Sequence, residues 1–176
     1  MLAATYENIE LERISRALRV LSSGCRAVIQ AEDEARLFSE ICGIITDAGG
    51  YAMAWIGIAE NDSKKSVRAA ARCGRGAEEF LDTHGITWSD EPHGRGPTGA
   101  CIRTGRAAVC RESGTDPNFE PWRQKAARHG YHSVIALPIR CEGRVIGSLT
   151  ICPGEPHVHR VRTRDQCLER QARAPG

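Results

Sequence analysis

The first clear pattern in the chain is a narrow apolar stripe near its N-terminus. Within residues 7–30, apolar side chains recur at spacings of three and four, and Cys25 fills the one gap in the series. This 3.5-residue repeat predicts a helix and is typical of a coiled-coil seam. Two interpretations stay open: the helix packs on its own domain, or it forms a coiled coil that joins two copies of the chain as a homodimer or couples the chain to a neighbouring module. The residues of the seam are Leu11, Ile14, Leu18, Leu21 and Val28.

Helical and extended patterns then alternate. A second amphipathic helix is predicted at residues 33–47, and the apolar runs 51–59 and 66–73 predict a pair of strands. Further helices are expected at 77–84, 98–104 and 121–130, with a third strand at 107–112. This order predicts an α+β fold: a mostly antiparallel five-stranded sheet with helices on one face and a lid of loops and helices on the other.

The last strand pair has the most specific local signal. Residues 133–141 and 144–152 flank Glu142-Gly143, which suits a two-residue type I′ turn. This turn predicts that Cys141 lies opposite Arg144, Ala136 opposite Leu149 and Ser133 opposite Cys152. Pro138 has no N–H to donate, so we expect a bulge or an unpaired position there.

Three regions follow from these patterns: an N-terminal helix at 1–30, a core at 31–153 and an Arg-rich tail at 154–176, for which a ragged end or a short helix is expected. The net charge of +2 is too small to indicate a nucleic-acid partner. No apolar run approaches the roughly 18 residues of a membrane span, and no export signal is evident. We therefore expect a cytoplasmic protein without a membrane partner, whose eight cysteines are reduced and mostly buried as small hydrophobic side chains.

Three motifs carry a resemblance to a known family. They are Gly-Arg-Gly-Pro-Thr-Gly at 94–99, Asp-Pro-Asn-Phe-Glu-Pro-Trp at 116–122, and Ser-Val-Ile-Ala-Leu-Pro-Ile at 133–139 followed by Gly-Arg-Val-Ile-Gly at 143–147. With them, residues 11–151 resemble a GAF domain of the subgroup that occurs in bacterial multidomain sensors beside PAS, diguanylate cyclase, phosphodiesterase or histidine kinase modules. The resemblance implies a noncatalytic sensory or regulatory domain in bacterial signal transduction, with a signalling output protein as a further partner. The Arg-rich tail departs from the acidic, leucine-rich closing helix of the family, which argues against output through the C-terminus.

The resemblance also implies a ligand cavity between the sheet and the lid. Its walls would be Trp55, Trp88, Thr98, Cys101, Asp116, Phe119, Trp122, Tyr131, His132 and Ser133. An apolar box with a few convergent polar groups suits a small molecule. The alternative is that Trp88, Phe119 and Trp122 are core residues that hold the lid on the sheet.

The identity of a ligand or cofactor is left open by the sequence. A bilin is disfavoured because bilin-binding GAF domains typically carry a Cys-His pair, which this chain lacks. Haem would need His129 or His132 as an axial ligand, and both are more typical of packed or surface histidines. The glycine-rich residues 93–99 lack the features of a P-loop or a dinucleotide fingerprint, so a tight turn is favoured over a phosphate site.

Two other function classes stay open beside the sensory one. One GAF branch reduces free methionine sulfoxide with cysteine nucleophiles, and Cys101 or Cys110 would have to serve here. The other is a structural dimerisation module without a ligand. We expect no catalytic residue and no metal site, since Cys152, His157 and His159 have loose spacing for metal ligands.

Overall fold

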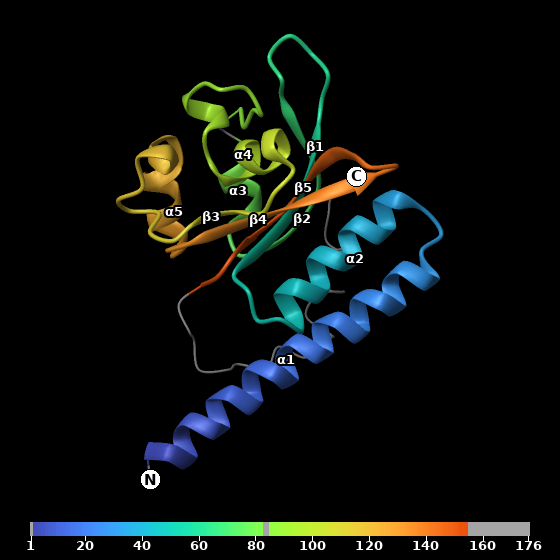
Figure 1. Cartoon of the computed structure of the whole chain (residues 1–176), viewed down its shortest axis with the longest axis vertical. Helices are drawn as coiled ribbons and strands as arrows, with labels where there is room; N and C mark the ends of the chain where they lie inside the picture. The colour runs from blue at the N-terminus through green and yellow to red at the C-terminus, as the bar shows by residue number, and fades with distance from the viewer. Residues whose placement is uncertain (1, 83–84, 155–176) are drawn as a thin grey trace, which may run out of the picture.

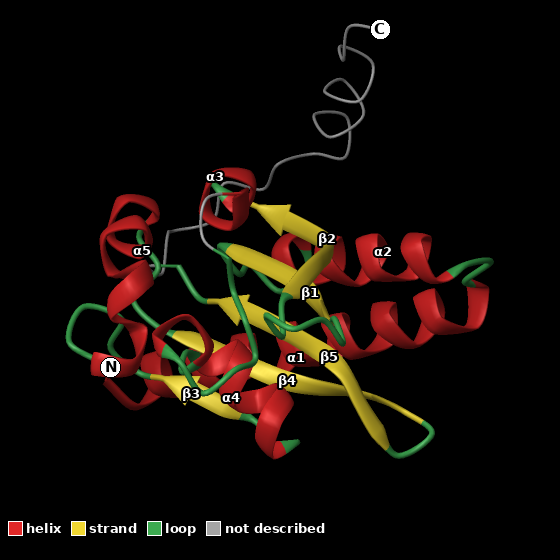
Figure 2. Cartoon of the chain, turned by 90° about the horizontal axis from the view of Figure 1, so that it is seen from above, coloured by secondary structure: helices red, strands yellow, loops and turns green. Residues whose placement is uncertain are grey.

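The computed structural model describes residues 2–82 and 85–154, and it confirms the predicted α+β class (Figures 1 and 2). The five strands are β1 (Met53–Ala59), β2 (Val67–Gly74), β3 (Ala108–Cys110), β4 (Val134–Cys141) and β5 (Arg144–Cys152). They form one sheet in the order β2-β1-β5-β4-β3, and every neighbouring pair is antiparallel. In the described part of the chain, no helix combines the length and apolarity that crossing a membrane requires.

Two long helices, α1 (Leu2–Gln30) and α2 (Glu34–Asp47), cover one face of the sheet (Figure 1). Asp33 caps α2, since its carboxylate accepts a hydrogen bond of 2.8 Å from the backbone N–H of Arg36. Phe38, Cys42 and Ile45 of α2 pack against Ala54 and Ile56 of β1. We call this side of the sheet the helix face.

Five short helical segments of the described chain cover the opposite side, which we call the lid face (Figure 1). They are α3 (Ala77–Asp82), the 3-10 turn η1 (Pro92–Gly94), α4 (Pro97–Thr104), the 3-10 turn η2 (Pro117–Trp122) and α5 (Arg123–His129). The predicted single helix at 121–130 is thus wrong at its start: Asp116 caps a 3-10 turn that contains Pro121, and the α-helix begins only at Arg123.

The predicted β4–β5 hairpin is correct at its turn and wrong beyond it. Glu142 and Gly143 have φ of 49° and 80°, as a type I′ turn requires, and Cys141 lies opposite Arg144. A bulge then places Ile146 without a partner, between the pairs Arg140↔Val145 and Ile139↔Gly147.

The bulge shifts every later pair by one residue. Ala136 consequently lies opposite Thr150 instead of Leu149, and Pro138 is paired with Ser148 rather than bulged. Ser133 precedes the strand, which starts at Val134. Because a shift of one residue reverses which side chains share a face, the bulge is what brings Thr150 to the lid face.

Two separate stripes run along α1. Val20, Gly24 and Ala27 face the domain: Val20 packs on the helix-face core, Gly24 approaches Ile41 of α2, and Ala27 is fully buried. The predicted seam lies elsewhere on the helix, with Leu11, Ile14, Leu18, Leu21 and Val28 between 52% and 64% exposed. The helix therefore packs on its own domain, but through this other stripe, while the seam residues stay exposed within one chain. The N-terminal half of α1 also extends past the body of the domain (Figure 1).

Candidate functional site

An apolar cavity lies between the sheet and the lid. It contains about 350 Å³ of empty space, including its open mouth. The lining residues come from three strands and from most of the lid segments: Trp55, Phe80, Ile86, His93, Gly96, Pro97, Thr98, Gly99, Phe119, Trp122, Val134, Thr150 and Cys152.

The floor of the cavity is built by strand alternation. Trp55 of β1, Val134 of β4, and Thr150 and Cys152 of β5 all point to the lid face. Trp55 lies opposite Thr150 across the β1–β5 pair, and it is only 2% exposed. The neighbours of these residues along the strands, such as Ile56, contribute to the helix-face core instead.

The glycines of the 94–99 motif allow close packing at the cavity wall. A Cβ on Gly96 would lie 2.6 Å from the indole of Trp122, and one on Gly99 would lie 2.1 Å from the carbonyl oxygen of Gly94. Pro97 then begins α4, a position where its missing N–H costs nothing. The motif therefore places the start of α4 directly against Trp122.

Arg103 of α4 holds the loop at the mouth of the cavity. Its guanidinium donates to the backbone carbonyls of Ser89 at 2.5 Å, Gly94 at 2.6 Å and Trp88 at 3.2 Å. His93, exposed at the mouth, meets the indole of Trp122 edge to face, with ring centroids 6.1 Å apart.

The lining residues carry few polar side-chain groups. The hydroxyls of Thr98 and Thr150 form a buried hydrogen bond of 3.0 Å. The indole N–H of Trp122 is buried and has no acceptor among the residues that the structure describes. None of the described lining residues is Asp, Glu, Lys or Arg.

Four of the ten predicted wall residues line the cavity: Trp55, Thr98, Phe119 and Trp122. Trp88 lies outside it, because its indole N–H donates to the carbonyl of Glu60 at 3.0 Å and the ammonium of Lys65 lies 4.9 Å from its ring centroid. Trp88 thus holds the connection between β1 and β2.

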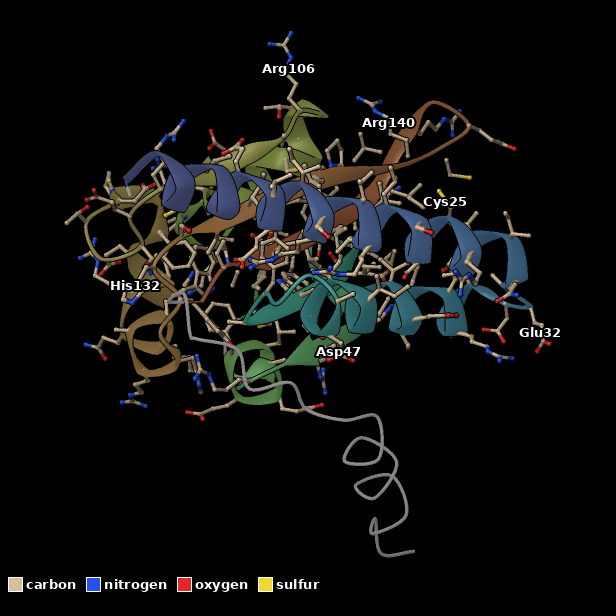
Figure 3. The ribbon with its side chains drawn as sticks, turned by 90° about the horizontal axis from the view of Figure 1, so that it is seen from below. Cys25, Glu32, Asp47, Arg106, His132 and Arg140 are labelled. Atoms are coloured by element: carbon tan, nitrogen blue, oxygen red, sulfur yellow. The ribbon has the colours of Figure 1, made fainter. Side chains whose placement is uncertain are left out.

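The other predicted residues also lie outside the lining. Cys101 is buried within α4, and the Asp116 carboxylate caps η2 by accepting from the Asn118 N–H at 2.8 Å. Tyr131 packs behind Phe80 and donates its hydroxyl hydrogen to the Arg75 carbonyl. His132 is exposed at the molecular edge (Figure 3), and Ser133 lies just before β4.

Nine lining residues were not predicted: Phe80, Ile86, His93, Gly96, Pro97, Gly99, Val134, Thr150 and Cys152. The glycines and Pro97 belong to a motif that the sequence singled out as a turn. The apolar residues carry no local signal for the cavity, because only the packing of α3 and the strands brings them to it.

The buried thiols are poor nucleophiles. Burial raises the pKa of Cys101 to about 11, against a smaller opposing effect of Arg140. Burial and the nearby carboxylate of Asp116 raise the pKa of Cys110 to about 11. Burial also raises the pKa of Cys152, with a further contribution from Cys110. At neutral pH these groups are thiols, whereas nucleophilic chemistry needs the thiolate.

No cluster of metal ligands is found among the described residues, and neither histidine considered as a haem ligand lines the cavity. Within residues 2–82 and 85–154, no three His, Cys, Asp or Glu side chains are grouped as metal ligands, and His157 and His159 lie outside the described residues. His129 packs against Tyr131 and lies 3.5 Å from the carboxylate of Glu79, away from the cavity lining.

Comparisons with known proteins relate the sequence of the chain to one family. A protein-family profile described as a GAF domain matches residues 31–166. A search of curated proteins finds no match.

Solved structures with similar folds have different functions. The A. aeolicus Nlh2 GAF domain in an inactive state has a TM-score of 0.59 at 18% identity, over 91% of this chain and 88% of that one. A Neisseria meningitidis free methionine-R-sulfoxide reductase in complex with its substrate has a TM-score of 0.60 at 17% identity, over 78% and 72%. A Staphylococcus aureus NreA mutated in its nitrate-binding site has a TM-score of 0.55 at 20% identity, over 78% and 99%. At these identities the likeness shows the fold alone.

Proposed function

The chain belongs to the GAF domain family, and from that premise we propose that it is a noncatalytic sensory or regulatory domain of bacterial signal transduction. It binds a small molecule in the cavity on the lid face and forms a homodimer through α1. The observation that supports the binding role is the cavity itself, with aromatic and aliphatic walls and a few convergent polar groups.

The chemistry of the site supports a noncatalytic role. Cys152 lines the cavity as a neutral thiol, and Cys101 and Cys110 have pKa values of about 11. A thiol in an apolar setting is inert compared with a thiolate in an electropositive one. Turnover of free methionine sulfoxide that is lost in Cys101→Ser would overturn this part of the proposal.

The substrate of that alternative reaction also fits the cavity poorly. Free methionine sulfoxide carries an ammonium and a carboxylate, which need charged or strongly polar partners when they leave water. The described lining offers neither an acidic side chain nor Lys or Arg. The likeness to the N. meningitidis reductase shows the fold alone, at 17% identity, and does not argue for this substrate.

The seam on α1 supports a dimer with a second copy of the chain. Its residues are exposed although they are large and apolar, and their 3.5-residue spacing is the pattern that two helices need to pack along one seam. A second copy provides the same spacing in register when the two helices run parallel. The helix has 29 residues and is about 43 Å long, which is enough for this contact.

Cys25 provides a direct test of the parallel arrangement. It is exposed on α1 and occupies the seam position between Leu21 and Val28 (Figure 3). In a parallel, in-register pair the two copies of Cys25 face each other, so mild oxidation should give a disulfide-linked dimer that Cys25→Ser abolishes. Cys141 is also exposed and lies on the β4–β5 hairpin, so Cys141→Ser is the matched control. A strictly monomeric protein in light scattering at several concentrations would contradict the dimer.

Strand β1 offers a physical connection between the two proposed roles. Trp55 forms part of the cavity floor, and the next residue, Ile56, packs in the helix-face core beneath α2. A ligand would favour one arrangement of lid and helices over another, by no more than its difference in affinity for the two arrangements.

Native mass spectrometry of the purified protein tests the binding role. We expect a mass excess from a retained small molecule that is released on denaturation. Val134→Phe should remove the excess because Val134 points into the cavity, and Ile135→Phe, on the same strand but facing the helices, should keep it. Binding that is unaffected by Val134→Phe would contradict the proposed site.

A further inference from the structure

Resting on the proposed function, we infer that the cavity selects a small neutral ligand, largely aromatic or aliphatic, that accepts a hydrogen bond. Anions and zwitterions of the same size are rejected. The inference comes from the size of the cavity, from the charge of its lining and from its unused hydrogen-bond donor.

The size of the cavity sets the upper limit for the ligand. Its empty space is about 350 Å³, of which the mouth is open to solvent. This value includes the open mouth and the gaps between atoms, so it is an upper bound, and the enclosed part alone has room for about one water molecule. At about 30 Å³ per water molecule in the liquid, the upper bound corresponds to a ligand of at most on the order of ten non-hydrogen atoms, part of which lies in the mouth. Nucleotides, haem and bilins are much larger than this limit.

The charge of the lining excludes ions. Apart from His93, which is exposed to water at the mouth, the described lining residues have neutral side chains at pH 7. The dipole of α4 places only roughly half a positive elementary charge at its N-terminus. The helix begins with Pro97, which has no N–H, and the N–H of Ala100 already donates to the Gly96 carbonyl at 3.0 Å. The attraction of this partial charge does not compensate for the hydration free energy that an anion loses when it leaves water.

An unused donor of the lining selects for an acceptor on the ligand. The indole N–H of Trp122 is buried without an acceptor among the described residues. A ligand that offers this N–H an acceptor adds a hydrogen bond that the protein alone does not make. The hydroxyls of Thr98 and Thr150 share one bond of 3.0 Å, and the Thr150 hydroxyl also lies 3.5 Å from that of Ser148, so the Trp122 N–H is the donor on which the inference rests. A ketone or amide carbonyl is the kind of group that this donor recognises.

The test uses three probes that have the same number of non-hydrogen atoms and nearly the same shape. Acetophenone is neutral and accepts hydrogen bonds, isopropylbenzene is neutral and does not, and benzoate is an anion. Ligand-observed NMR titrations at pH 7.5 should give the tightest binding for acetophenone, about tenfold weaker binding for isopropylbenzene and no measurable binding for benzoate. Benzoate that binds as tightly as acetophenone would overturn the inference.

The role of the Trp122 N–H is tested by Trp122→Phe, which keeps an aromatic ring and removes the donor. We expect the affinity for acetophenone to fall about tenfold and that for isopropylbenzene to stay the same. Trp88→Phe is the matched control because Trp88 lies outside the cavity, and it should change neither affinity.

The outcomes separate this inference from the proposed function. Equal binding of acetophenone and isopropylbenzene to the wild type keeps the cavity as a binding site and overturns the claim about the acceptor. No binding of any probe, together with no retained molecule in native mass spectrometry, overturns both. If near-ultraviolet circular dichroism shows that Trp122→Phe is not folded, the ranking of the three probes on the wild type decides.

Discussion

The two faces of the sheet are built from alternate residues of the same strands, yet they pack in different ways. The helix face is filled by aliphatic side chains of β1 and β5 against Phe38, Cys42 and Ile45 of α2. The lid face carries large aromatic residues, buried hydroxyls and a cavity between them. Close packing on one side fixes the position of the strands, and incomplete packing on the other leaves room for a ligand. The helix side in turn presents its own unpaired apolar surface, the seam of α1.

The largest effect is expected on assembly through α1. Leu18→Glu combined with Leu21→Glu places carboxylates in the proposed seam, and burying them without partners should weaken the dimer more than about a hundredfold. Since both leucines are exposed within one chain, the stability of the monomer should change little. Sedimentation equilibrium measures the dissociation constant, and Arg19→Glu, between the two positions, is the control. A dimer that withstands the double substitution uses another surface.

The second effect is a loss of stability at alkaline pH. Burial, with a smaller contribution from Cys73, raises the pKa of Cys42 from 9.0 to about 12. A group whose folded pKa is raised stabilises the protein below its unfolded pKa, and this contribution disappears as the pH rises from about 9 to about 12. The free energy of unfolding should fall in that range by about 1.4 kcal/mol per pH unit for this thiol.

Urea unfolding of the wild type and of Cys42→Ala measures this dependence. The variant loses packing at every pH, but its stability should decline less steeply above pH 9, where the Cys42 thiol of the unfolded wild type ionises. Parallel pH profiles of the two proteins would show that Cys42 is not protected from ionisation in the folded state.

The difference in packing between the two faces can be measured by overfilling each of them. Ala54→Leu adds volume beneath α2, where Ala54 is fully buried, and should cost about 1–3 kcal/mol. Val134→Phe adds volume beside the cavity and should cost less than Ala54→Leu, because empty space receives part of the ring. Thermal and urea unfolding give both values. The reverse order would mean that the lid face is as closely packed as the helix face.

The smallest effect is expected at Trp88. Trp88→Phe keeps most of the ring and removes the hydrogen bond to the Glu60 carbonyl, so the free energy of unfolding should fall by about 0.5–1.5 kcal/mol. Urea unfolding measures this loss. A loss above about 3 kcal/mol would show that Trp88 is part of a core, as Trp55 is.

The sequence predicted the fold through patterns that local geometry determines. The 3.5-residue spacing on α1, the amphipathic pattern of residues 33–47 and the positive φ of Gly143 each depend on neighbouring residues only. The β4–β5 register failed because the bulge lies at Ile146 on β5, whereas the irregular residue in the sequence is Pro138 on β4.

Of the four wall residues that were predicted correctly, Trp55 lies on β1 and the other three belong to recognisable turn motifs. Phe119 and Trp122 lie in the 116–122 motif and Thr98 in the 94–99 motif. Thr150 was missed because the bulge decides its face, and Trp88 was misplaced because its acceptor, the Glu60 carbonyl, is 28 residues away. Side-chain positions that depend on contacts across the sheet are not encoded in any short stretch of sequence.

The central claim is that the lid face, and not the helix face, binds a small molecule. Methyl NMR during a titration with acetophenone compares the two faces on adjacent residues, since Val134 lines the cavity and Ile135 points to the helices. We predict a saturable shift of the Val134 methyl signals while those of Ile135 stay in place. Saturable shifts at Ile135 with none at Val134, or no saturable shift at either residue, would contradict the claim.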